Sequence, residues 1–385
     1  MRSIPYARQW IDKRDVLEVS RALETAWLTQ GPGVEAFERS VADYCGVRYA
    51  VAVNSGTSAL HIACLAIGLK AGDEAITSPI TFVASANCVL YCNARPVFAD
   101  INEETVCVDP ESIHKKINSK TAAIIPVHFG GHPCDMDRIC TLAKNRNIAV
   151  IEDACHALGA EFRGSKIGSC KYSDITVLSF HAVKHITTGE GGMVLTNSKK
   201  YYQKLQALRT HGIRRDSRLL KRGFGAWYYE MQTLGFNYRL TDIQCALGLS
   251  QLRKIERFLR RRKEIALAYD KAFSQIDGLK LVKNKPYVKS SHHLYVVRFD
   301  RGGFTGSRKE IFDEYRRHGI IANVHYIPVY NHPYYKRLGY KSNQCVRAEK
   351  YYAEAITLPL YPKMKDGDVG RVIRVTKTII SKFSK

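Results

Sequence analysis

The chain has 385 residues, of which 45% are hydrophobic and 25% are charged, a balance typical of a globular protein with a large core. No run of about 18 or more apolar residues occurs, which argues against a membrane-spanning helix. The net charge of +23 attracts polyanions, so nucleic-acid binding is one interpretation that composition leaves open.

The cysteines and histidines indicate neither disulfides nor a metal site. Eleven cysteines are scattered along the chain without a CxxC pair, and we expect reduced, buried thiols. His128/His132 and His292/His293 lack the HExxH spacing of a zinc helix, so we predict no metal. The first residues lack the basic start and apolar run of a secretion signal, and we expect a cytoplasmic protein.

Short apolar runs alternate with amphipathic segments from about residue 47 onward. We predict strands at residues 49–53, 74–78, 96–99, 122–127, 149–152, 174–180 and 192–196. Helices are predicted at residues 57–69, 82–90 and 135–144. Alternating strands and helices, with strands that are apolar along their length, predict an α/β fold whose mostly parallel sheet is covered on both faces.

A different pattern begins at about residue 241. The predicted elements are a helix over residues 241–273 with Thr241 or Asp242 as its cap, a strand at 293–299 and a helix at 308–318. We therefore expect a large domain over residues 1–250 and a small C-terminal α/β domain over residues 251–385. For residues 1–30 we consider an arrangement in which this segment packs on the small domain.

Polar residues follow several predicted strands, where open α/β sheets bind their ligands. Ser55, Gly56, Thr57 and Ser58 lie between a strand and a helix. Small residues at such a turn let backbone N–H groups bind an anion such as phosphate, although Ser and Thr are also ordinary helix caps.

Asp153 ends another predicted strand, and Lys184 follows a third. A carboxylate at a buried strand tip needs a cation, either a protonated pyridine nitrogen or an Arg or Lys. Lys184 lies between His181 and His185, and a lysine in a partly apolar pocket has the lowered pKa that suits a Schiff-base lysine; most lysines, however, are surface residues.

An anion site, a strand-tip aspartate and a pocket lysine are together what pyridoxal 5′-phosphate requires of a protein. Phe82 is a candidate to stack on the cofactor ring, and a core aromatic is the alternative interpretation.

At this point the chain resembles a known family, the fold-type-I pyridoxal-phosphate enzymes of the DegT/DnrJ-type nucleotide-sugar aminotransferases. The resemblance spans most of the sequence. The matching stretches include LTQGPG (28–33), NSGTSAL (54–60), PITFVASAN (79–87), EDACHALG (152–159), SFHAVK (179–184), GFNYRL (235–240) and HYIPV (325–329).

The resemblance implies a role for each matching residue. It makes Lys184 the Schiff-base lysine and proton carrier, and Asp153 the partner of the pyridine nitrogen. Further cofactor contacts are implied for Gly56, Thr57, Ser58, Phe82, His156, Ser179 and Asn237. In relatives the asparagine at the position of Asn237 reaches the phosphate of the neighbouring subunit, which implies a homodimer with shared active sites.

Within the family the chain most resembles the transaminases of pseudaminic acid biosynthesis, which act at C4 of a UDP-4-keto-6-deoxy-N-acetylhexosamine. Glutamate is the implied amino donor, and no nucleic-acid or membrane partner is implied. Tyr6 and Gln30 are candidates for the sugar pocket. Basic residues of one loop are candidates for the substrate's diphosphate, namely Arg214, Arg215, Arg218, Lys221 and Arg222.

Other functions remain open. Transaminases for dTDP or GDP sugars share most of these motifs, and neither the aminated carbon nor its stereochemistry follows from them. A pyridoxamine-dependent sugar dehydratase would carry histidine in place of Lys184. A non-catalytic regulatory protein of the same fold would not need Lys184, Asp153 and the anion site together.

Overall fold

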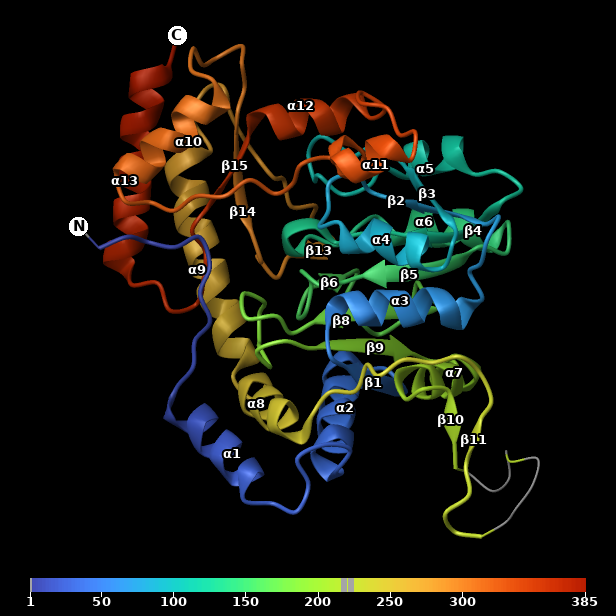
Figure 1. Cartoon of the computed structure of the whole chain (residues 1–385). Helices are drawn as coiled ribbons and strands as arrows, with labels where there is room; N and C mark the ends of the chain where they lie inside the picture. The colour runs from blue at the N-terminus through green and yellow to red at the C-terminus, as the bar shows by residue number, and fades with distance from the viewer. Residues whose placement is uncertain (1, 216–219, 221–224) are drawn as a thin grey trace.

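The computed structural model of the chain describes residues 2–215, 220 and 225–385. A seven-stranded sheet forms the centre of its larger part, with the strands in the order β1-β9-β8-β5-β4-β2-β3 (Figure 1). The strands are β1 (Tyr49–Val53), β2 (Glu74–Thr77), β3 (Arg95–Phe98), β4 (Thr121–Ile125), β5 (Ala149–Asp153), β8 (Ile175–Ser179) and β9 (Gly192–Thr196). Only β9 among them runs antiparallel to its neighbours, so the sheet is mostly parallel, as predicted.

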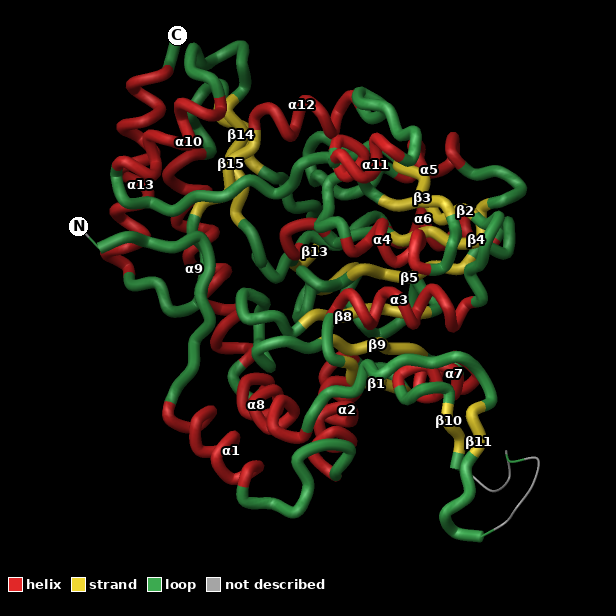
Figure 2. Tube along the Cα trace, viewed as in Figure 1, coloured by secondary structure: helices red, strands yellow, loops and turns green. Residues whose placement is uncertain are grey.

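Helices cover both faces of this sheet (Figure 2). One face packs against α3 (Gly56–Ile67), α4 (Ala84–Tyr91) and α7 (Lys199–Arg209). The other faces α2 (Pro32–Cys45), α5 (Pro110–Lys116), α6 (Met136–Lys144) and α8 (Asp242–Leu252). Because side chains alternate along a strand, Ile151 lies in the core of the first face and Val150 in that of the second.

A second, smaller sheet has the strand order β12-β14-β15. Its strands are β12 (Leu279–Leu281), β14 (Tyr295–Phe299) and β15 (Ala355–Leu358), and its helices are α9 (Ile255–Phe273), α10 (Arg308–Arg317) and α13 (Asp366–Phe383). These elements enclose a core of their own, which includes Tyr269, Val297 and Val372. The predicted strand and helix of this region are therefore present, at 295–299 and 308–317.

The larger core also takes in part of the C-terminal half. Between β14 and β15 the chain forms η3 (Val329–Asn331), α11 (Pro333–Arg337) and α12 (Val346–Glu354). Tyr330, Tyr335 and Tyr351 from this stretch belong to the core of the large sheet. The division into two domains at residue 250 stays a prediction. Residues 329–354 pack on the larger core and so connect the two parts.

The N-terminal segment also spans both parts. Ile4 pairs with Ile320 and is buried in the smaller core, in keeping with the packing considered for residues 1–30. Helix α1 (Lys13–Leu23) then packs against α8, where Asp15 accepts hydrogen bonds from Ser250 (2.7 Å), Gln251 (2.8 Å) and Lys254 (2.6 Å).

The long helix predicted over residues 241–273 is two helices, α8 and α9. Thr241 caps the first one, as expected, by accepting the N–H of Gln244. Lys254 separates the two because its backbone (φ −105°, ψ 0°) leaves the helical region.

Short elements complete the fold. They are η1 (Phe129–Gly131), β6 (Glu161–Phe162), β7 (Ser165–Lys166), β13 (Val288–Lys289), β10 (Ile213–Arg214) and β11 (Glu230–Met231). The β10–β11 ribbon projects from the body of the molecule beside α7 (Figure 1). Within the described part of the chain, no helix is both long and apolar enough to cross a membrane.

Candidate active site

A cavity of about 720 Å³ lies at the carboxyl ends of β5 and β8. The start of α3, the start of α4, the loop after β8 and residues 323–327 form its walls. Eight of the sequence-predicted residues line it, namely Tyr6, Gly56, Thr57, Phe82, Asp153, His156, Ser179 and Lys184. The fold therefore brings most of the predicted site together.

The first turn of α3 forms an anion cradle on one wall of this cavity. The N–H groups in the first turn of a helix have no partner within the helix and carry partial positive charge. Gly56 lies so close to Ser179 that a Cβ at this position would be 2.9 Å from Ser179 Cβ and 3.2 Å from its Oγ. The glycine thus keeps space beside the Ser179 hydroxyl, and the cradle fits a phosphate group.

Ser58, in contrast, does not line the cavity. Its N–H donates to Ser55 Oγ (3.0 Å), and its own hydroxyl donates to Asn54 Oδ1 (2.6 Å). Ser58 therefore belongs to the cap of α3, which was the alternative interpretation of this motif.

Asp153 is the last residue of β5, and its side chain points into the cavity. It is buried, with only 5% of its surface exposed. Oδ2 accepts from Ser85 Oγ (2.6 Å), and Oδ1 accepts from the backbone N–H of Cys155 (3.1 Å). Two neutral donors orient the carboxylate and leave its charge available to a cation in the cavity.

Lys184 is partly buried and lines the same cavity. Burial lowers the pKa of its amino group, while the charges of Asp153 and Glu190 act in the opposite direction. A lowered pKa makes the unprotonated, nucleophilic amine more abundant at neutral pH.

His156 lies between aromatic groups. Its ring stacks on Tyr326 at 6.1 Å, and its Nε2 is 3.3 Å from the Tyr326 hydroxyl. Burial, followed by the charges of Lys184, His325 and His185, holds the pKa of His156 well below its usual range, so the ring is neutral. Its buried Nδ1 has no hydrogen-bond partner among the described residues, which leaves it free for a polar group of a ligand.

Phe82 and Tyr6 line the outer part of the cavity. Phe82 is 59% exposed and makes only a tilted contact with Tyr326, at 6.4 Å, so it is not a core residue. Tyr6 lies near His325, with ring centroids 5.4 Å apart, and burial raises the pKa of its hydroxyl. Both side chains are placed to contact a ligand that fills the cavity.

The other predicted contacts lie outside this cavity. Gln30 and Asn237 are exposed on the surface. Arg214 donates to the carbonyl of Gln203, and the Arg215 guanidinium lies 5.4 Å from the Tyr229 ring centre. Arg218, Lys221 and Arg222 lie outside the described residues.

Two residues that contact the predicted site residues were not predicted from the sequence. Ser85 orients Asp153, and Tyr326 contacts His156. Both lie inside stretches that carried the family resemblance, 79–87 and 325–329. Because they are distant in sequence from Asp153 and His156, no spacing rule could pair them.

Comparison with known proteins agrees with this geometry. The model of the DegT/DnrJ/EryC1/StrS aminotransferase family matches residues 9–377. The chain belongs to this family. The predicted resemblance, the fold class and the aminotransferase activity are thereby confirmed.

Two curated relatives cover nearly the whole chain. The spore coat polysaccharide biosynthesis protein SpsC of Bacillus subtilis is 41% identical over 386 residues, with 98% of this chain and 97% of the relative covered. The UDP-4-amino-4,6-dideoxy-N-acetyl-β-L-altrosamine transaminase of Campylobacter jejuni (strain 81-176) is 38% identical, with 99% of each covered.

A solved structure is similar over the same length. It is PseC of Helicobacter pylori, an aminotransferase involved in the biosynthesis of pseudaminic acid, with a TM-score of 0.91 and 33% identity. The alignment covers 99% of this chain and 100% of the PseC chain.

Proposed function

We propose that this aminotransferase uses pyridoxal 5′-phosphate to move an amino group from L-glutamate to C4 of a UDP-4-keto-6-deoxy-N-acetylhexosamine. The product is a UDP-4-amino-4,6-dideoxy sugar. The observation that carries the proposal is the meeting of Lys184, Asp153 and the α3 cradle in one cavity. The name of the Campylobacter jejuni relative supports the choice of sugar.

The cavity suits this cofactor at three points. Gly56, Thr57 and Ser179 hold its phosphate at the start of α3. Asp153 pairs with the ring nitrogen and keeps a proton on it. His156, neutral and with its Nδ1 unpaired, and Phe82 would contact the cofactor ring.

Lys184 carries the proton in the reaction. When bound, the cofactor withdraws electrons from the substrate carbon that loses its proton. Lys184 Nζ would take that proton, because its lowered pKa lets it act as a base near neutral pH. Asp153, oriented by Ser85, keeps its charge in place throughout.

In this proposal a second copy of the chain completes the cofactor-binding end of the site. Asn237 is exposed and lies outside this chain's own cavity. Exposed apolar side chains surround it in the sequence, namely Trp227 (75%), Tyr229 (50%), Met231 (65%) and Leu234 (75%). Exposed apolar side chains are typical of an interface, and we assign this stretch of the chain to a homodimer in which each chain completes the other's site. Gln30, Arg214 and Arg215 are then candidates to meet the partner's substrate.

We place the protein in the cytoplasm. All eleven cysteines are free and ten are buried, which fits a reducing compartment.

Replacing Lys184 tests the proposal directly. Lys184→Ala should slow formation of 2-oxoglutarate and of the amino sugar at least about a hundredfold, because the general base is lost. Lys271→Ala, an exposed lysine of α9, is the matched control and should keep wild-type rates. After borohydride treatment, mass spectrometry should find the cofactor on the peptide that contains Lys184; attachment to another lysine would contradict the assignment.

The substrate is tested separately. UDP-, dTDP- and GDP-4-keto sugars should be compared side by side, and we expect the highest kcat/KM for the UDP sugar. A preference for dTDP or GDP would leave the aminotransferase in place and reject the proposed sugar. Elimination of water without amino transfer would indicate a dehydratase, and no turnover of any sugar would favour a regulatory protein.

A further inference from the structure

Glu152 immediately precedes Asp153, and its side chain lies on the other face of β5. Only 3% of Glu152 is exposed. Neighbouring strand residues point to opposite faces, so the Glu152 carboxylate is directed away from the cavity that Asp153 enters. The mechanism proposed above does not use this buried acid.

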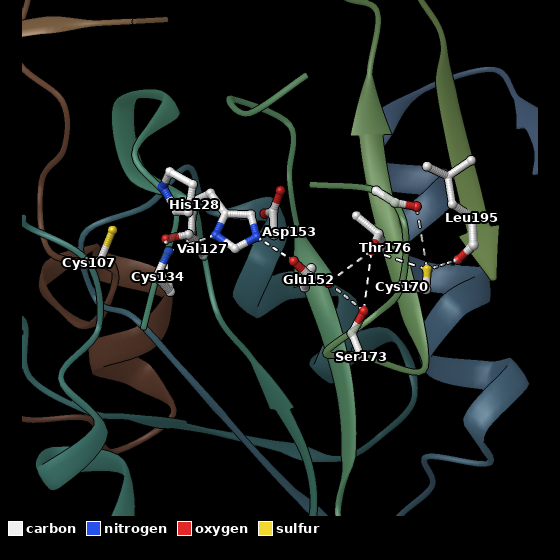
Figure 3. Close-up of polar contacts among 12 residues, drawn as sticks. Cys107, Val127, His128, Cys134, Glu152, Asp153, Cys170, Ser173, Thr176 and Leu195 are labelled. Carbon is white, nitrogen blue, oxygen red and sulfur yellow. Dashed lines mark hydrogen bonds and ion pairs between the residues drawn. The ribbon is translucent and has the colours of Figure 1, made fainter. Parts of the chain in front are cut away.

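Glu152 accepts hydrogen bonds at both carboxylate oxygens (Figure 3). Oε1 accepts from Ser173 Oγ (2.5 Å) and from Thr176 Oγ1 (3.1 Å). Oε2 lies 2.7 Å from His128 Nε2. Three donors on two oxygens are the arrangement of an ionised carboxylate.

His128 is neutral, as its second hydrogen bond shows. The backbone N–H of Cys134 donates to His128 Nδ1 at 3.0 Å, so Nδ1 carries no proton. Nε2 therefore holds the only ring proton and donates it to Glu152. All three groups that contact the carboxylate are neutral, and no Arg or Lys pairs with it in the part of the chain that the structure describes.

The loop that carries His128 also holds the backbone of Asp153. The N–H of His128 donates to the Asp153 carbonyl (3.1 Å), and the N–H of Asp153 donates to the Pro126 carbonyl (2.9 Å). The end of β5 is thus held at two neighbouring residues. Main-chain hydrogen bonds hold Asp153, and the hydrogen bond from the His128 ring holds Glu152.

A buried carboxylate without a cationic partner lowers stability compared with an apolar residue of similar size. The fold nevertheless keeps this charge one residue from the aspartate that faces the cofactor. In the dry interior a negative group at this range raises the affinity of the neighbouring site for a positive charge.

We infer that Glu152, with His128, is a positioning residue for the cofactor: its buried charge and the His128 contact strengthen the hold of Asp153 on the protonated ring nitrogen. The inference rests on the proposed function, because it presupposes that pyridoxal 5′-phosphate binds at Asp153. Glu152 touches neither substrate nor cofactor and acts through Asp153.

The variant Glu152→Gln tests this role because it removes the charge and retains the shape. The full chain, freed of cofactor, is titrated with pyridoxal 5′-phosphate and with its 1-deaza analogue, in which carbon replaces the ring nitrogen. The wild type should prefer the nitrogen-containing ligand, and Glu152→Gln should reduce that preference about tenfold, the effect of one charge at short range. Glu35→Gln, at an exposed ion pair with Arg39, makes the same chemical change and should leave the preference unaltered.

The two ligands separate the possible outcomes. An equal loss for both ligands in Glu152→Gln, or no loss for either, would overturn the inference, because a merely structural role does not distinguish ring nitrogen from carbon. Failure of the wild type to bind pyridoxal 5′-phosphate would instead reject the proposed function.

A second variant covers the case in which Glu152→Gln does not fold. Glu152→Leu combined with Ser173→Ala and Thr176→Val removes the carboxylate together with two of its donors, a change that proteins tolerate better than loss of one partner. The same fall in preference is expected, and an unchanged preference would again overturn the inference.

Discussion

Single residues of the cavity act through their immediate neighbours. Lys184 has a lowered pKa because it is buried, and Asp153 is oriented by Ser85 and by the N–H of Cys155. That Lys184 and Asp153 line one pocket could be predicted from the sequence, since a strand-tip acid and a pocket lysine carry chemistry of their own. Ser85 could not, because its role exists only once α4 is packed against β5.

Gly56 is the residue at which space matters most. Gly56→Ala would place a Cβ 2.9 Å from Ser179 Cβ, so one of the two must move and the cradle narrows. We expect affinity for pyridoxal 5′-phosphate to fall by about 1–3 kcal/mol, the usual effect of overpacking. Gly367→Ala, where no atom lies within 4 Å of the added Cβ, should bind as the wild type does. Both variants should be titrated with pyridoxal 5′-phosphate and the binding followed by absorbance. Equal affinities of the two variants would show that the cradle tolerates a methyl group.

Glu190 changes the pKa of Lys184 in a known direction. Its negative charge raises that pKa against the lowering by burial, so Glu190→Gln should lower it further. The rate at which the protein captures pyridoxal 5′-phosphate depends on unprotonated Lys184 and therefore rises with pH through this pKa. In Glu190→Gln we expect this increase in capture rate to occur about half a pH unit lower than in the wild type.

The matched control for that pH profile is Glu111→Gln, at an exposed ion pair with Arg138. Its profile should coincide with that of the wild type. A shift of the Glu190→Gln profile toward higher pH would mean that Glu190 does not stabilise the charged form of Lys184.

At the scale of elements, helix termini place the functional loops. The start of α3 holds the anion cradle, and the start of α8 holds the loop 28–33: Asp242 accepts the N–H groups of Gly31 (2.8 Å) and Gly33 (2.9 Å). The seven strands of the large sheet and its helices α3, α4 and α6 were predictable from periodicity to within a few residues, whereas α2, α5 and α7 were not among the predicted elements. The break at Lys254 between α8 and α9 was not predictable, because the apolar pattern runs through it without interruption.

Removal of Asp242 should loosen the loop that carries Gln30. Asp242→Ala leaves the Gly31 and Gly33 N–H groups without their acceptor, and we expect a loss of about 1–3 kcal/mol in unfolding free energy together with a higher KM for the nucleotide sugar. Asp366→Ala makes the same change in the first turn of α13, at a side chain that is 93% exposed, and should alter neither. Thermal unfolding and steady-state kinetics measure the two effects; a higher KM in both variants would point to a general charge effect.

At the scale of the whole molecule, loops of the large sheet, Tyr6 and residues 323–327 together line the cavity. The β10–β11 ribbon projects from the body of the molecule beside α7 (Figure 1). The family and the α/β class could be predicted because many short motifs occur in a fixed order. The packing of residues 329–354 on the larger core could not, since nothing in their composition separates them from the small domain. The exposed position of Asn237 likewise gains a meaning only when a second chain is considered.

The proposed sharing of active sites between two chains predicts a specific result for mixed dimers. Lys184→Ala and Asn237→Ala should each be inactive alone. After joint unfolding and refolding, mixed dimers contain one site with both defects and one intact site, so about a quarter of wild-type activity should return. Lys184→Ala, unfolded and refolded alone, gives the background activity. No recovery in a mixture shown by mass spectrometry to contain mixed dimers would mean that each chain completes its own site.

The course of synthesis is constrained by the pairing of Ile4 with Ile320. Tyr6, which lines the cavity beside Asn323, accepts a hydrogen bond from the N–H of Leu360 through its carbonyl. Ile4 and Tyr6 therefore lack these partners until residues 320 and 360 have been synthesised. The large sheet can form before that point, whereas the part of the cavity wall that contains Tyr6 can close only after residue 360 has been synthesised. A chain shortened before residue 320 therefore retains Lys184, Asp153 and the start of α3 but lacks this part of the wall.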